Sequence, residues 1–251
     1  MAPPYSILAT SKTPAVIIYL LDVSASMEQM LGDRRRIDVV TSALNAALRQ
    51  MVFRSTRGTR VLPRYRIAML AYSNHVYDLL DGIKGIDHVA GLGVPDLSTQ
   101  QSTDTARAFA TVEKLLLAEL PNLADGPAPL VCHLTDGEYM GDDPEPIVKR
   151  IMKLRVPDGN VLVENIFISD RLISEPLANP RQWRGIVPQT RFESDYANKL
   201  RAISSALPVG YRIMMREMGY QLDDNALMML PGTSAELVEL GFVMSTSTPV
   251  R

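Results

Sequence analysis

The chain has 251 residues, of which 46% are hydrophobic and 22% are charged. These fractions are ordinary for a folded globular protein and exclude a disordered, collagen-like or fibrous chain. The formal net charge is −2 and no basic run is longer than residues 34–36, which argues against a nucleic-acid partner.

Apolar runs typical of strands buried on both faces recur along the chain. The first covers residues 15–21 and is bounded by Pro14 and Asp22. The same pattern returns at residues 66–72, 130–134, 161–168 and 226–230. These runs predict the core strands of a largely parallel sheet.

Apolar residues at helical spacing lie between these strands. They predict helices over about 37–51, 106–116 and 147–154. The alternation of strand and helix predicts an α/β fold with helices on both faces of the sheet. Ser73 and Asn74 separate the second strand from "HVYDLL", which favours a short antiparallel hairpin at the sheet edge.

The C-terminal half carries further local signals. Asp143 and Pro144 are typical of an N-cap and a first helical position. Thr233 and Glu236 predict a capping box that opens the last helix.

The remaining stretches of the C-terminal half do not follow the strand–helix alternation. We expect an irregular insertion at about residues 171–194 and a helix near 196–207, while residues 211–222 are compatible with helix or loop. No linker divides the chain, so we expect one domain over residues 1–251 with a core at about 14–245.

Oxygen-bearing side chains follow two of the predicted strands and precede one helix. In an open α/β sheet, ligands bind at the carboxyl ends of the strands. Three loops meet this condition, and they contribute Asp22, Ser24 and Ser26, then Thr103, Asp104 and Thr105, and finally Thr135, Asp136 and Gly137.

Alternate residues of an extended segment project to the same side, so Asp22, Ser24 and Ser26 can converge on one point. Hydroxyl and carboxylate oxygens suit a hard divalent cation such as Mg²⁺. The pattern therefore predicts a cation site.

The segment D-V-S-A-S at residues 22–26, Thr103 in S-T-D-T-A-R-A and Asp136 in L-T-D-G resemble a known set of motifs. They are similar to the D-x-S-x-S, T and D elements of the metal-ion-dependent adhesion site (MIDAS) of von Willebrand factor A domains. Ala25 and Ser102 stand where many members have glycine, and neither change removes a ligand. The choice of Thr103 over Thr105 rests on matching the T element.

The resemblance implies a doubly wound, mostly parallel sheet with one short antiparallel edge strand. It also implies that Ser24, Ser26 and Thr103 contact Mg²⁺ or Mn²⁺, while Asp22 and Asp136 bind the metal directly or through water. Because few carboxylates touch the ion in such a site, the ion keeps its attraction for a Glu or Asp of a partner protein.

The function expected from the resemblance is metal-dependent protein binding. Intracellular bacterial members of the family act with AAA-type ATPases or with protein kinases and phosphatases, which implies a scaffold or regulatory role. The alternative is a metal-dependent phosphoryl-transfer enzyme that uses Asp22. We expect no enzyme, because no second carboxylate neighbours Asp22 and no hydrolase, phosphate-loop or dinucleotide motif is present.

The remaining signals have structural explanations. The run 34–36 is typical of a solvated face, although it could also attract an acidic partner. Asp142 and Asp143 could be outer ligands of the metal, but the sequence favours Asp143 as a helix N-cap. The histidines and Cys132 share no metal-ligand spacing and are expected in the core or at edges. Trp183 is expected to hold its loop or to rim the site.

The expected compartment is the cytoplasm. One cysteine excludes an internal disulfide and fits a reducing environment. The apolar run at 15–21 is too short to span a bilayer, and the first residues lack the basic start and cleavage site of a signal peptide. We therefore expect no membrane partner.

Overall fold

The computed structural model describes residues 3–100, 102–137, 139–169, 172, 177, 179–248 and 250. In this part of the chain a seven-stranded sheet has the order β13-β12-β9-β1-β6-β7, with β8 pairing β6. The strands are β1 Ala15–Asp22, β6 Tyr65–Tyr72, β7 Val76–Asp78, β8 Lys84–Gly85, β9 Leu130–Thr135, β12 Leu162–Phe167 and β13 Met229–Pro231. All pairings are parallel except those of β7 and β8 with β6.

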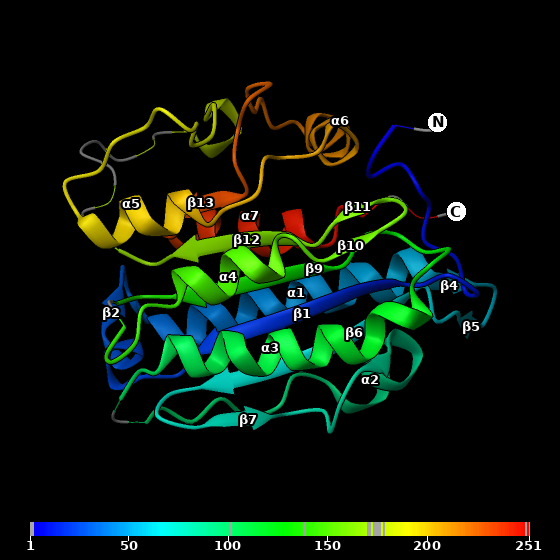
Figure 1. The fold of residues 1–251 in the computed structure, drawn as a ribbon, viewed down its shortest axis with the longest axis horizontal. Coiled ribbons are helices and arrows are strands. Elements are labelled where there is room, and N and C mark those ends of the chain that lie inside the picture. The colour runs from blue at the N-terminus through cyan, green and yellow to red at the C-terminus, as the bar shows by residue number, and fades with distance from the viewer. Residues whose placement is uncertain are drawn as a thin grey trace.

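Helices cover both faces of the sheet (Figure 1). One face packs against α1 Arg36–Ser55, α2 Ile86–Leu92 and α7 Ala235–Ser245, and the other against α3 Thr105–Glu119, α4 Glu145–Ile151 and α5 Asp195–Ala202. The helix α6 Val209–Glu217 packs with α7 beside β13. The predicted α/β class, with a mostly parallel, doubly wound sheet and an antiparallel edge, is confirmed.

Short hairpins and turns connect these elements. The hairpins are β2 Met30–Leu31 with β3 Arg34–Arg35, β4 Thr56–Arg57 with β5 Arg60–Val61, and β10 Arg155–Val156 with β11 Gly159–Asn160. The 3-10 turns are η1 Ala25–Glu28, η2 Leu120–Asn122 and η3 Pro180–Gln182.

The central strand β1 explains why an unbroken apolar run is needed. All eight of its residues are buried. Ile17, Tyr19 and Leu21 enter the cluster with α1 and α7, whereas the alternate residues enter the cluster with α3, α4 and α5. Both faces of the strand therefore require apolar side chains, as expected for a parallel sheet covered on both sides.

The strands predicted at 15–21, 66–72, 130–134 and 161–168 lie within one residue of the observed ones, whereas the predicted helices miss the observed C-terminal ends by three residues or more. The helix predicted at 196–207 ends at Ala202, because the following chain leaves the helix to pair with strands. The N–H of Ser205 donates to the carbonyl of Val163 at 2.9 Å, and that of Leu207 donates to Ala226 at 2.9 Å. The strand predicted at 226–230 begins only at Met229.

Two helix starts were placed one residue early. The N-cap of α7 is Ser234, whose hydroxyl accepts the N–H of Leu237, so the predicted capping role of Thr233 is wrong. The carboxylate of Asp143 does accept a helix N–H, that of Glu145 at 3.0 Å, but α4 begins at Glu145 itself. Helix boundaries commonly shift by this amount.

The ambiguous and irregular regions take definite forms where they are described. The first part of 211–222 belongs to α6. Within the irregular insertion predicted at 171–194, residues 171, 173–176 and 178 lie outside the described residues. Trp183, just after η3, is partly buried and packs against two hydrophobic clusters. None of the described helices has both the length and the apolar character that a membrane crossing requires.

Candidate metal centre

The candidate site lies where two neighbouring parallel strands end. Leu21 of β1 is paired with Leu134 of β9, so the residues that follow each strand emerge side by side. Asp22 is the last residue of β1 and is completely buried. The loop after β9 begins with Asp136. The strand register therefore fixes the spacing between the two predicted motifs.

Asp22 is held from two sides. One carboxylate oxygen, Oδ1, accepts the backbone N–H of Ser24 at 2.8 Å, and Oδ2 accepts the Thr135 hydroxyl at 2.9 Å. Burial raises the pKa of Asp22 to about 6, although its hydrogen bonds with Ser24 and Thr135 act in the opposite direction. The sequence placed Thr135 at this edge but gave it no role, and the structure makes it the residue that orients Asp22.

A chain of hydroxyl and carboxyl groups joins the two loops. The hydroxyl oxygens of Ser24 and Ser26 are 3.0 Å apart, and the Ser26 hydroxyl donates to Oδ1 of Asp136 at 2.7 Å. The second oxygen of Asp136 accepts from Nη1 of Arg36 at 2.9 Å. Four of the five predicted site residues are thus brought together through their side chains or adjoining backbone.

Thr103 reaches the same edge through its backbone. The N–H of Met140, in the loop after β9, donates to the Thr103 carbonyl at 3.0 Å. The N–H of Gln100 donates to the carbonyl of Val23 at 2.7 Å. The third loop therefore contacts the other two. The Thr103 side chain is buried, and no hydrogen bond joins its hydroxyl to the other four predicted site residues, all of which are described.

The donor set fits a small, hard divalent cation. Adjacent ligands in an octahedron with metal distances of about 2.1 Å lie roughly 3.0 Å apart. The Ser24 and Ser26 oxygens have this separation. Among the described residues no group of three or more His, Cys, Asp or Glu side chains is positioned to hold a metal. A cation at this edge would therefore depend on hydroxyl ligands, as the sequence motif predicts.

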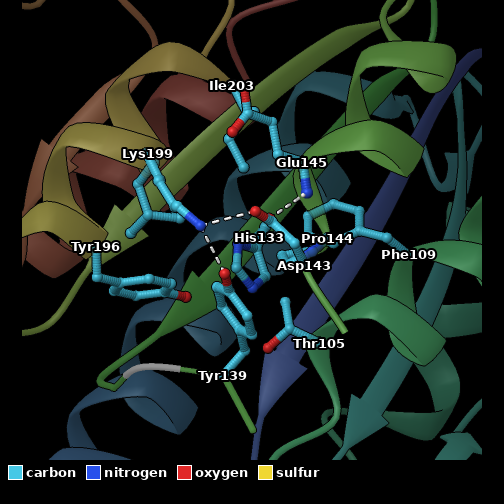
Figure 2. Close-up of a pocket in the computed structure, with 11 residues that line it drawn as sticks. Thr105, Phe109, His133, Tyr139, Asp143, Pro144, Glu145, Tyr196, Lys199 and Ile203 are labelled. Carbon is cyan, nitrogen blue, oxygen red and sulfur yellow. Dashed lines mark hydrogen bonds and ion pairs between the residues drawn. The ribbon is translucent and has the colours of Figure 1, made fainter. Parts of the chain in front are cut away.

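A second cluster lies beside the site in the pocket of Figure 2. Lys199 of α5 donates to the Tyr139 hydroxyl and to Oδ2 of Asp143, each at 2.7 Å. The Lys199 ammonium lowers the pKa of Asp143. Asp143 is therefore engaged by Lys199 and by the N–H of Glu145 at the start of α4, although the N-cap of this helix is Pro144. Thr105, the alternative T-element residue, lines this pocket and is buried at the start of α3.

A buried polar chain crosses the sheet below the site. His133 accepts or donates on both ring nitrogens, with Tyr72 at 2.8 Å from Nε2 and Asn165 at 2.8 Å from Nδ1. Burial lowers the pKa of His133 to about 4, so the ring is neutral at physiological pH. Its full burial agrees with the predicted core position. The hydrogen bonds could not be foreseen, because their partners lie on two other strands.

Arg36 is a buried residue at the candidate site that the sequence did not indicate. The run 34–36 was read as a solvated face, but Arg36 is only 7% exposed and contacts Asp136. Arg35 does lie at the surface, where it pairs with Glu28 and Asp38. Arg35 ends the strand β3 and Arg36 begins the helix α1. This change of backbone conformation points the two neighbouring side chains in different directions.

Comparison with known proteins identifies the fold. No protein-family model and no curated protein matches the chain. Among solved structures, the chain aligns over 92% of its length with proximal thread matrix protein 1 of the mussel byssus, with a zinc-occupied MIDAS motif, at 15% identity and a TM-score of 0.54. The chain spans 47% of that protein.

Two further structures match along almost their whole length. BatB from Bacteroides thetaiotaomicron is 14% identical with a TM-score of 0.51, over 90% of this chain and 96% of that one. The VWA domain of SpRpn10 is 13% identical with a TM-score of 0.50, over 91% and 93%. At these identities the likeness shows the fold alone, and that fold is the von Willebrand A fold.

Proposed function

We propose that this chain is a protein-binding module that depends on Mg²⁺ or Mn²⁺. Ser24, Ser26 and Thr103 would contact the cation, and Asp22 and Asp136 would hold it directly or through water. The observation that carries the proposal is the hydroxyl chain from Ser24 through Ser26 to Asp136 at the carboxyl edge of the sheet. The zinc-occupied MIDAS motif of the mussel protein, which shares the fold, supports it.

The chemistry of the site suits capture of an acidic side chain. Neutral hydroxyls donate less electron density to a cation than carboxylates do, and the five predicted site residues include two carboxylates, Asp22 and Asp136. When bound, the cation would supply a Lewis-acidic position for a Glu or Asp of a partner protein. The residues of this chain would orient that position, because Asp22 is fixed by Ser24 and Thr135.

The partner and the compartment are further parts of the proposal. We infer a scaffold or regulatory role in the cytoplasm, with an AAA-type ATPase or a protein kinase or phosphatase as partner. The resemblance of the motifs to the von Willebrand A family, whose intracellular bacterial members often act with such proteins, supports this choice. The buried free thiol of Cys132 is compatible with a reducing compartment.

We propose a binding role in place of catalysis. Asp22 is completely buried, and the groups that donate hydrogen bonds to its two oxygens, the Ser24 N–H and the Thr135 hydroxyl, are not general acids or bases. A phosphoryl-transfer site would need an acid-base partner beside it. Mg²⁺-dependent turnover of a phosphatase substrate, abolished by Asp22→Ala, would overturn this part of the proposal.

Thermal unfolding with increasing Mg²⁺ tests the cation site. A ligand at 100 times its dissociation constant stabilises the folded state by about 2.7 kcal/mol, which raises the melting temperature of a chain this size by roughly 5–10 °C. Ser24→Ala with Ser26→Ala should abolish the rise. Ser11→Ala, at an exposed position before β1, should leave it unchanged. An equal rise in the melting temperature of all three proteins would contradict the site.

Affinity for a partner tests the binding role. Pull-downs from native extract with Mg²⁺ and with EDTA should differ in the proteins retained, and the double serine variant with Mg²⁺ should behave as the wild type does with EDTA. A partner purified in this way should then bind in a Mg²⁺-dependent manner. Equal binding in EDTA would refute metal-dependent capture.

A further inference from the structure

Arg36 places a positive charge inside the candidate metal centre. It is the first residue of α1 and follows two arginines that are exposed to solvent. Its side chain is 9% exposed, whereas that of Arg35 is 49% exposed. Burial of an arginine is unfavourable without a partner. The position of Arg36 is therefore a specific feature of the site.

The partner of Arg36 is the carboxylate of Asp136. Nη1 of Arg36 lies 2.9 Å from Oδ2 of Asp136, and the Asp136 side chain has no exposed surface. The other oxygen of Asp136 accepts from Ser26 at 2.7 Å. Both oxygens thus carry a hydrogen bond from this chain. The low exposure of the pair reduces solvent screening, so each charge acts strongly on its surroundings.

The ion pair changes the charge that a cation would meet. Asp22 and Asp136 together carry two negative charges when ionised, and Arg36 offsets one of them. A unit positive charge about 6 Å from a divalent cation weakens the binding of that cation about tenfold, even at the dielectric constant of bulk water. The same charge strengthens the attraction for an anionic group that arrives at the cation.

We infer that Arg36 is a specificity-determining residue that holds the cation affinity of the free protein low, so that stable occupancy requires the acidic group of the partner. The inference rests on the proposed function. It assigns to Arg36 a role that none of the five motif residues has. Cation and acid would then bind cooperatively, because each lowers the electrostatic cost of the other.

Binding of Mn²⁺ alone tests the inference, with free Mn²⁺ measured by its electron paramagnetic resonance signal. The variants are Arg36→Gln and Arg36→Met, which remove the charge and keep much of the side chain. The controls are Arg36→Lys, which keeps the charge, and Arg35→Gln, which removes the exposed neighbour that pairs with Glu28 and Asp38. Circular dichroism establishes that each variant is folded.

Both neutral variants should bind Mn²⁺ about tenfold more tightly than the wild type, while Arg36→Lys and Arg35→Gln should stay within about twofold. Measurable binding by the neutral variants alone, with none by the wild type, also supports the inference. If the wild type binds Mn²⁺ through Ser24 and Ser26 but neither neutral variant binds more tightly, the inference is overturned and the proposed function stands. Absence of Mn²⁺ binding in every protein overturns both.

Discussion

Glu164 is a buried acid whose replacement should stabilise the protein in a pH-dependent way. It lies within β12 and has no exposed surface, and among the described residues no nitrogen or oxygen donor reaches its carboxyl oxygens, beside which lies only the weakly donating thiol of Cys132. Its neighbour on β9 is Cys132, which is also buried. Burial raises the pKa of Glu164 well above its usual value. The folded protein therefore keeps a proton that the unfolded chain releases.

The sign and size of the effect follow from this difference in proton binding. Stability from protonated Glu164 is complete below the unfolded pKa of 4.5 and is lost as the pH rises toward the folded pKa. Glu164→Gln replaces the neutral acid by a neutral amide of similar shape. Each pH unit corresponds to about 1.4 kcal/mol, so the variant should gain up to about 2.7 kcal/mol over the wild type between about pH 5 and pH 7.

Urea unfolding of both proteins at about pH 5, 6 and 7 measures this gain. Glu239→Gln in α7 is the matched control, since it makes the same replacement at an exposed position and removes no buried acid. The argument would be refuted if the difference between Glu164→Gln and the wild type stayed constant with pH or became smaller as the pH rose.

Two further changes test the core beneath the site. His133→Leu should lower the free energy of unfolding by about 2–4 kcal/mol, because it leaves the buried Tyr72 hydroxyl without its acceptor, and adding Tyr72→Phe should recover part of this loss in urea unfolding. The free-energy difference between the wild type and His133→Leu should also shrink by about 1.4 kcal/mol per unit as the pH falls from about 6.5 toward 4, since the buried ring of the wild type resists protonation. Gly241→Val should lower stability by about 1–3 kcal/mol, because a Cβ at Gly241 would lie 2.5 Å from Cδ1 of Ile166. Gly91→Ala, with no atom within 4 Å of its Cβ, should instead raise stability by about 0.5–1 kcal/mol, and equal effects at the two glycines would contradict the packing argument.

The sequence predicted the parts of the fold that depend on periodic burial. The runs that became β1, β6, β9 and β12 are apolar throughout because both faces of the sheet are covered. By contrast, α2 is a seven-residue helix with two buried residues, which is too little to produce a period. The end of α5 was misplaced because pairing of Ser205 with Val163 overrides the helical signal.

The same contrast applies to the candidate site. Asp22, Ser24 and Ser26 could be placed at a strand end, because the residues that follow an apolar run are read directly from the sequence. Arg36 could not be placed there, since its partner Asp136 is 100 positions away and a run of three arginines is usually solvated. The local pattern therefore predicted the hydroxyl groups of the candidate site, whereas the position of Arg36 depends on a contact that exists only in the folded chain.

The hydrogen bond between Ser26 and Asp136 indicates how both residues would contribute to cation binding in the proposed site. A hydroxyl can donate its proton to a carboxylate and still offer a lone pair to a cation. Ser26 donates to Asp136 at 2.7 Å, so cation binding at the Ser26 oxygen would leave this hydrogen bond intact and polarise it further. Asp136, with its other oxygen on Arg36, would then act on the cation through Ser26 without direct contact. This geometry favours the indirect one of the two roles that the motif left open for Asp136.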